Sequence, residues 1–130
     1  MKAPKLNDSK WQVALDEVVP RLAKFQERLN AISDDIRTLE KTLTESGFRI
    51  YTSINLSSGE ILAWTEIGSS WRISFLQQGD SDGEFVVRPL IETPAAVRWH
   101  VAHEVPRLLR EIAVVAAANE PPITDDDFPF

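Results

Sequence analysis

The sequence contains no cysteine and no stretch of 18 consecutive apolar residues. Without cysteine the chain cannot form disulfides or thiolate metal sites, and this composition is typical of the reducing cytoplasm. Without a long apolar stretch we expect no membrane span. The opening residues MKAPKLNDSK are basic, but they lack the apolar segment of a secretory signal. These absences predict a cytoplasmic protein with no membrane partner.

Motifs of enzymes and of cofactor binding are also absent. The sequence contains no Walker loop, no GxGxxG fingerprint and no cysteine nucleophile. His100, His103 and Glu104 lie within one helical turn and could supply two or three metal ligands. Because no further ligand cluster accompanies them, we interpret them as partly exposed helix residues. We therefore predict a protein that is not an enzyme and that uses no metal and no cofactor.

Acidic charge is concentrated at the C-terminal end of the chain. The 130 residues carry a net charge of −6, from 20 acidic and 14 basic side chains. Residues 120–130 contain four of the acids and no base, so residues 1–119 hold 16 acids against 14 bases, a net charge of −2. A chain of this length supports one domain. We expect a single domain over residues 1–119 and a disordered acidic tail over residues 120–130.

A heptad repeat of apolar residues predicts that the N-terminal third is helical. Ser9 and Gln12 have the spacing of a capping box, and the Ser46-Gly47 dipeptide provides a C-terminal stop. Pro20 interrupts the pattern, so we expect a short first helix and a long second helix from about residue 20 to 46. The apolar positions alternate in steps of four and three: Trp11, Leu15, Val18, Leu22, Phe25, Leu29, Ile32, Ile36, Leu39 and Leu43.

This repeat can be satisfied in two ways. It can pack on the protein's own sheet, or it can pair with a second copy in a homo-oligomer such as a dimer. In a parallel pair Asp35 would face Glu40, a repulsion with no compensating ion pair, whereas an antiparallel pair could bring Arg28 near Asp35. Both interpretations stay open, because a repeat of this length is unusual for a helix that only covers a sheet.

The middle of the chain has the alternation of a β-sheet. Residues 48–56 alternate apolar and polar side chains, and three further strand-like segments follow after turns or loops. Successive hairpins of this kind build a four-stranded antiparallel meander. The three later segments cover residues 60–67, 71–78 and 84–90.

A second helical region follows the strands. Thr93 and Pro94 are suited to the N-cap and first turn of a helix that runs to about Ala118, with a kink at Pro106. The predicted fold class is therefore α+β: an N-terminal helix with coiled-coil-like heptads, a four-stranded antiparallel meander, a C-terminal helix and the acidic tail.

One face of the predicted sheet has the composition of a nucleic-acid surface. We assign to the core face Phe48, Ile50, Ile54, Ile61, Ala63, Ile67, Trp71, Ile73 and Phe75. Aromatic rings that stack bases and guanidinium groups that meet phosphates are typical of single-stranded DNA or RNA binding. The candidate residues on the other face are Arg49, Tyr51, Trp64, Arg72 and Arg88, beside Glu66. A covering helix, or ordinary cross-strand pairing on a hydrated face, would explain the same pattern.

The last residues, DDDFPF, combine three acids with two aromatic side chains. They resemble the C-terminal tip of bacterial single-stranded DNA-binding proteins, in which an acidic stretch ends in Pro-Phe. In that family the tip docks to replication, recombination and repair proteins. The resemblance covers about six residues and does not extend to the body. The residues it concerns are Asp125, Asp126, Asp127, Phe128, Pro129 and Phe130, with Phe128 where Ile or Leu is commoner.

These features lead to a function hypothesis with two alternatives. The first is a single-stranded DNA-binding accessory protein of replication, recombination or repair, encoded by a phage or mobile element, that recruits host partners through its tail. A second is an oligomeric interaction protein without DNA affinity, whose tail competes for the docking pockets of host proteins. A third is a tail that lies on the protein's own basic face as a phosphate mimic.

Overall fold

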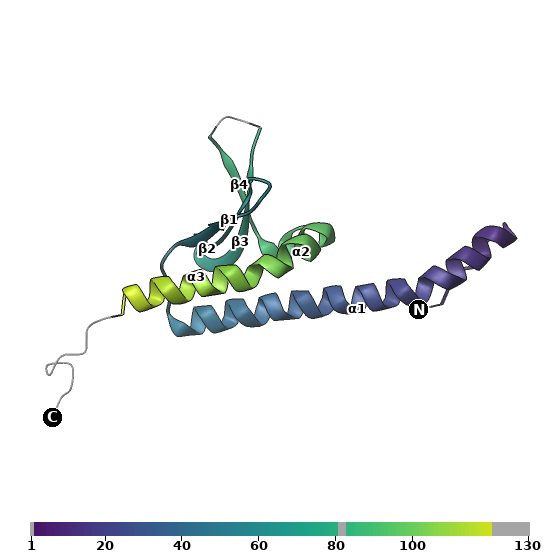
Figure 1. The fold of residues 1–130 in the computed structure, drawn as a ribbon, viewed down its shortest axis with the longest axis horizontal. Helices are drawn as coiled ribbons and strands as arrows, with labels where there is room; N and C mark the ends of the chain where they lie inside the picture. Colours follow the sequence, from purple (N-terminus) through teal and green to yellow (C-terminus); the bar gives the residue numbers. More distant parts are fainter. Residues whose placement is uncertain (1, 81–82, 121–130) are drawn as a thin grey trace, which may run out of the picture.

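A computed structural model describes residues 2–80 and 83–120; the predicted tail from residue 121 onward lies outside the described residues. The fold is α+β, as predicted: a long N-terminal helix, a four-stranded antiparallel sheet and a C-terminal helical region (Figure 1). The helices lie on one side of the sheet. Within the described part of the chain, no helix is long and apolar enough to cross a membrane.

Helix α1 is one continuous element from Ser9 to Ser46. Its N-cap is Asp8, whose carboxylate accepts hydrogen bonds from the backbone N–H groups of Lys10 and Trp11. The predicted capping box starting at Ser9 is therefore wrong by one residue. At the other end Gly47 adopts the left-handed conformation, with a φ of 79°, and ends the helix as expected.

The prediction of two helices separated at Pro20 is also wrong. Pro20 lies inside α1, and the helix bends in its N-terminal part instead of breaking (Figure 1). A proline removes one backbone hydrogen bond and pushes away the carbonyl four residues earlier, here that of Asp16. Pro20 and Asp16 are both exposed, so water can satisfy that carbonyl and the helix continues.

The sheet is a meander in the order β1-β2-β3-β4, with every neighbouring pair antiparallel. Its strands are β1 (Thr52–Asn55), β2 (Ile61–Ile67), β3 (Ser70–Gln78) and β4 (Phe85–Pro89). Strand β1 starts later than residue 48, where we predicted it. The backbone carbonyl of Phe48 instead accepts a 2.9 Å hydrogen bond from the indole Nε1 of Trp64.

The register of the strands reverses our assignment of β2 to the two faces of the sheet. Trp64 pairs with Ile73, and Leu62 pairs with Phe75, so these four side chains share the face that the helices cover. Trp64 is fully buried, at 0% exposure. Both alternating sets of β2 contain apolar residues, and the set with the larger side chains, Leu62 and Trp64, faces the helices. Its burial removes more apolar area from water.

The C-terminal helical region is divided into segments. A short 3₁₀ turn, η1 (Leu90–Glu92), precedes α2 (Ala95–Val101); a second 3₁₀ turn, η2 (Ala102–Glu104), connects α2 to α3 (Val105–Ala118). Pro106 lies in the first turn of α3, where the missing N–H breaks no helical hydrogen bond. The residue marks the start of a new helix, and not the kink in one helix that we predicted. Thr93 does not cap α2, because its hydroxyl donates to the carbonyl of Leu90.

One core joins the sheet to the helices that cover it. Residues from the second half of α1, from β2 and β3, and from α2 and α3 meet between the sheet and the helices. Its buried members are Ile36, Leu62, Trp64, Ile73, Phe75, Leu90, Val101, Val105, Leu108 and Ile112. No member of this core precedes residue 29, so the first half of α1 contributes nothing to the main core.

Replacing Trp64 by alanine should therefore destabilise the fold severely. Removing a buried Trp side chain leaves a cavity and typically costs about 3–5 kcal/mol. Tyr51→Ala is the matched control, since its side chain is 51% exposed and should change stability by less than about 0.5 kcal/mol. Equilibrium unfolding in urea measures both. Equal stabilities of the two variants would contradict the burial of Trp64.

Candidate nucleic-acid surface and neighbouring cavities

The predicted stacking surface loses its central aromatic residue in the fold. Trp64 lies in the core, its ring centroid is 5.8 Å from that of Trp71, and its indole N–H is bonded to Phe48. A base cannot reach this ring without unfolding the sheet. Tyr51 is exposed and precedes β1, so it is the aromatic member of the predicted set that remains accessible.

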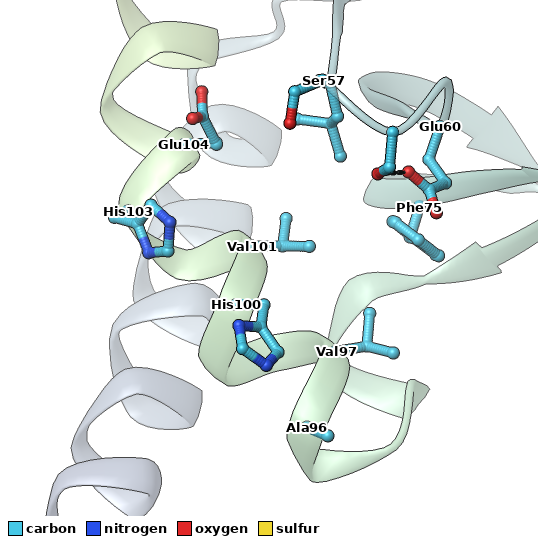
Figure 2. Close-up of a pocket in the computed structure, with 11 residues that line it drawn as sticks. Ser57, Glu60, Phe75, Ala96, Val97, His100, Val101, His103 and Glu104 are labelled. Atoms are coloured by element: carbon cyan, nitrogen blue, oxygen red, sulfur yellow. Dashed lines mark hydrogen bonds between the residues drawn. The ribbon is translucent and has the colours of Figure 1, made fainter.

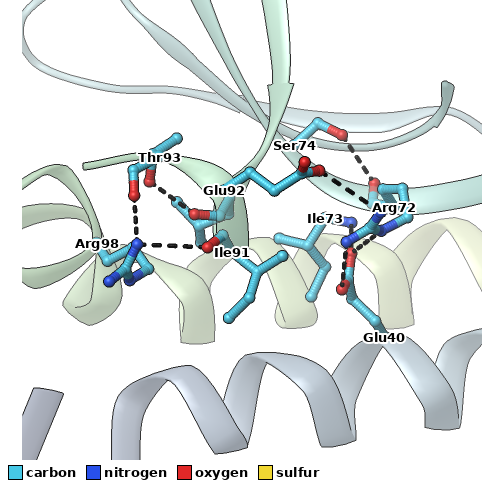
Figure 3. A network of polar contacts seen from close by, with 9 residues as sticks. Glu40, Arg72, Ile73, Ser74, Ile91, Glu92, Thr93 and Arg98 are labelled. Atoms are coloured by element: carbon cyan, nitrogen blue, oxygen red, sulfur yellow. Dashed lines mark hydrogen bonds and ion pairs between the residues drawn. The ribbon is translucent and has the colours of Figure 1, made fainter. Parts of the chain in front are cut away.

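Arg72 is bound by carboxylates of the protein itself. Its Nε donates to Glu40 Oε2 at 2.9 Å, and its guanidinium lies 3.9 Å from Glu92 (Figure 3). The hydrogen bond with Glu40 raises the pKa of Arg72 above its ordinary value; partial burial opposes this and the charges of Glu40 and Glu92 add to it. The guanidinium therefore stays charged, but its charge is already compensated.

Glu40 also completes the edge of the sheet. Its Oε2 accepts the backbone N–H of Ile73 at 2.9 Å (Figure 3). Strand β4 pairs with β3 only as far as Pro89, opposite Ser74, so Ile73 lies one residue beyond the ladder. A buried N–H without an acceptor would cost free energy. Sequence analysis did not predict this role of Glu40. The available signal was that Glu40 follows Leu39 of the apolar heptad, which places its carboxylate at the edge of the packed stripe.

Of the two remaining arginines, Arg88 does not share a surface with Arg72. Arg88 pairs with Phe75, which is three residues from Arg72 on β3, so Arg88 and Arg72 point to opposite faces. Arg49 lies in the segment before β1 and is exposed. Because Trp64 is in the core and Arg88 lies on the opposite face from Arg72, the five predicted residues Arg49, Tyr51, Trp64, Arg72 and Arg88 do not share one surface. That any of them contacts nucleic acid stays a prediction.

Arg49 and Arg72 do line one cavity, between the end of α1 and the β2–β3 turn. Its volume is about 620 Å³. Three of its four cations form ion pairs: Arg37 with Asp34, Lys41 with Glu45, and Arg72 with Glu40. Among the described residues, no ion pair involves Arg49. The charged residues that line the cavity are Arg37, Lys41, Arg49, Arg72, Glu40, Glu45 and Glu66. An anionic ligand would have to compete with these carboxylates.

A second cavity, of about 450 Å³, contains the two histidines (Figure 2). Phe75, Val97 and Val101 are among its apolar lining, and Ser57, Glu60, His100, His103 and Glu104 are among its polar lining. Within the described part of the chain, neither histidine is hydrogen-bonded to a serine or a carboxylate, and no three His, Cys, Asp or Glu side chains form a metal-binding group. Ser58, also in the lining, donates a hydrogen bond to the Glu60 carboxylate (Figure 2), and within the described residues neither histidine joins this pair to form a triad.

A third cavity lies where α3 ends. It has a volume of about 440 Å³ and a largely apolar lining that includes Leu43, Phe48, Ile50, Ile112 and Ala116. Asn119 and Glu120, the last described residues, are at its rim. The predicted docking residues Asp125, Asp126, Asp127, Phe128, Pro129 and Phe130 lie outside the described residues. Comparison with protein-family models, with curated proteins and with solved structures finds no match to this chain.

Loss of the Glu40 carboxylate should detach α1 from the sheet locally. Glu40→Ala leaves the Ile73 N–H and Arg72 without their acceptor, and we expect a loss of about 2–3 kcal/mol. Glu40→Gln keeps an oxygen acceptor and should lose about 1 kcal/mol. Glu45→Ala, in an exposed pair with Lys41, should lose less than about 0.5 kcal/mol. Thermal unfolding measures the series, and a Glu40→Ala value no larger than that of Glu45→Ala would refute the role of Glu40.

Proposed function

We propose that the protein is a non-enzymatic adaptor of DNA metabolism. It docks, through residues 125–130, to replication and repair proteins that bind the C-terminal tails of single-stranded DNA-binding proteins. The observation that supports this proposal is the C-terminal sequence DDDFPF.

Each part of the motif contributes differently to docking. In a chain that ends at Phe130, the aromatic ring can enter an apolar pocket while the α-carboxylate meets an Arg or Lys at its rim. Pro129 limits the conformations that are lost on binding. The three aspartates steer the segment toward a basic groove and raise the association rate.

The body supports the adaptor function better than it supports DNA binding. Trp64 is buried and Arg72 is paired with Glu40, so two of the five candidate contacts to DNA are engaged inside the fold. The body is also nearly neutral in net charge. Sequence-independent binding to the phosphate backbone of DNA depends on Lys and Arg side chains that are not already paired with carboxylates.

The docking segment lies close to the body along the chain. Helix α3 ends at Ala118, and the six residues before Asp125 span at most ~21 Å even when fully extended. A bound partner would therefore approach the end of α3, where the apolar third cavity lies. The partner is thus held against residues 1–119 of the adaptor, and this domain can block other contacts of the partner.

Docking should depend on the last residue of the chain. The 130-residue protein, expressed with Phe130 as its last residue, should compete with a labelled tail peptide of a single-stranded DNA-binding protein for one of that peptide's partners. Deleting Phe130, or adding one residue after it, should weaken competition at least tenfold, because the ring or the carboxylate leaves the pocket. Fluorescence anisotropy of the peptide measures this.

Phe128→Leu is the matched control for this competition, because it restores the residue type that is commoner in the family and should leave competition within about threefold. Undiminished competition by the Phe130 deletion would refute the docking proposal. Competition that is absent in the intact protein would refute it equally.

Binding of single-stranded DNA by the body is the second candidate function, and the exposed Arg49 and Tyr51 are the observation in its favour. We expect no saturable binding of an oligonucleotide at low salt, because the other candidate side chains are buried, paired or on the opposite face. Tryptophan fluorescence during the titration measures this. Saturable binding that is lost in Arg49→Ala and retained in Arg88→Ala would establish the second candidate instead.

A further inference from the structure

The heptad stripe of α1 is buried over only half of its length. From residue 29 to residue 43 it packs against the body, with Leu29 and Ile36 buried. The first half of the helix extends away from the sheet (Figure 1), and most of the stripe there is exposed. Trp11 is 69% exposed and Leu22 is 47% exposed. The exposed stripe consists of Trp11, Val18, Leu22 and Phe25, with Leu15 half-buried among them.

A helix with such a stripe needs something to pack against. An isolated helical segment of about 20 residues is marginal in water unless tertiary packing stabilises it. The N-terminal segment of the chain covers a different side of α1, since Gln12 bonds to Pro4 and Leu6, and Val19, two turns further along that side, is buried. Trp11, Val18 and Leu22 of the stripe remain exposed, whereas Leu15 is half-buried and the Phe25 ring packs in part against Trp99.

The spacing of the stripe indicates what kind of surface fits it. Steps of four and three residues keep a period of 3.5, which holds a straight seam against another helix that coils around it. The same seam packs in the protein's own core from Ile32 onward, and Leu29 before it is buried. The seam from Trp11 to Phe25, in which Phe25 also contacts Trp99, is therefore available for one helical partner of matching length.

We propose that this partner is the same segment of a second copy of the chain, packed antiparallel. With Leu15 and Leu22 at a positions and Val18 and Phe25 at d positions, antiparallel packing sets each a residue opposite a d residue. Leu22 then faces Val18 of the second copy, and Leu15 faces Phe25. The two-fold axis passes beside residue 20, and Pro20 lies at an f position, away from the seam.

A cavity on the body matches the end of this seam. The antiparallel register brings Trp11 of the second copy opposite Leu29. A hollow of about 240 Å³ lies at this level, lined by Arg28, Ile32, Trp99, Ala102 and His103. Its aromatic wall is already set: Arg28 lies over the Trp99 ring at 5.7 Å, and the Phe25 and Trp99 ring centroids are 4.5 Å apart. The exposed indole of Trp11 fills this hollow and stacks beside Arg28.

A parallel pair uses these features less well. It would set Trp11 against Trp11 and leave the hollow beside Trp99 empty. It would also bring both bodies to the same end of the pair, where the stripe beyond Leu29 is already occupied by each protein's own core. In the antiparallel pair the two bodies lie at opposite ends. Near its two-fold axis the two copies of Arg21 approach each other, and Glu17 of each helix lies one turn away to offset their repulsion.

The oligomeric state of the full chain tests this proposal. Sedimentation equilibrium should report a dimer at micromolar concentration, and Leu22→Glu should raise its dissociation constant at least a hundredfold because a carboxylate would be buried at the seam. Val13→Glu is the matched control: Val13 is equally on α1 and exposed, but at an f position, and should leave the dimer unchanged. A monomeric wild type, or a dimer insensitive to Leu22→Glu, would overturn the proposal.

Cysteine cross-linking fixes the orientation without relying on a destabilised variant. Because the chain has no cysteine of its own, each introduced thiol can report one distance. In the antiparallel pair Arg21→Cys brings two thiols together beside the two-fold axis, whereas Trp11→Cys sets them ~27 Å apart. Oxidation should therefore cross-link Arg21→Cys and leave Trp11→Cys monomeric on a denaturing gel. The reverse result would establish a parallel pair and overturn the antiparallel one.

Discussion

The carboxylate of Glu40 holds the molecule together at the point where helix and sheet meet. It receives the Ile73 N–H that β4 leaves free when it ends at Pro89, and it compensates Arg72 beside it. Each of these groups would be costly to bury alone, so the three are stable only together. This contact fixes the C-terminal half of α1 against β3. The same half of α1 contributes Ile32, Ile36, Leu39 and Leu43 to the core, while the N-terminal half of the helix projects from the body.

The succession of elements could be predicted because each has a local cause. The heptads of α1, the hairpins of the meander and the helix stop at Gly47 each depend on residues that are close together in the sequence. The faces of the sheet could not be predicted in the same way. Both alternating sets in β2 are apolar, Ile61 and Ala63 on one side and Leu62 and Trp64 on the other. Which set faces inward depends on the register with β3 and on the helices beyond, and neither is local to the strand.

The separation of the five candidate DNA-binding residues could not be predicted for a related reason. An arginine in a strand can meet a phosphate or a carboxylate of its own protein, and the two cases look identical in the sequence. Arg72 meets Glu40, which is 32 residues earlier in the chain. Pairing over such a distance is a property of the fold. The heptad stripe has the same ambiguity, since its period is uniform from Trp11 to Leu43 while its surroundings change at Leu29. The structure shows intramolecular packing for the C-terminal half of the helix, and pairing with a second copy is our proposal for the other half.

Pairing through the projecting half of α1 would change what a weak docking segment can accomplish. A single short acidic segment ending in Phe binds through few contacts, and much of its interaction energy is offset by the ordering of the segment. Two segments on one antiparallel dimer would engage an oligomeric partner, or two partners on one DNA strand, at a high effective concentration. Because the segment follows α3 within a few residues, the rigid body rather than a long linker would set the separation of the two docking points. The fixed separation of the two docking points would then distinguish between partners that share the same tail-binding pocket. Two docking segments on long linkers would not have a fixed separation and could not make this distinction.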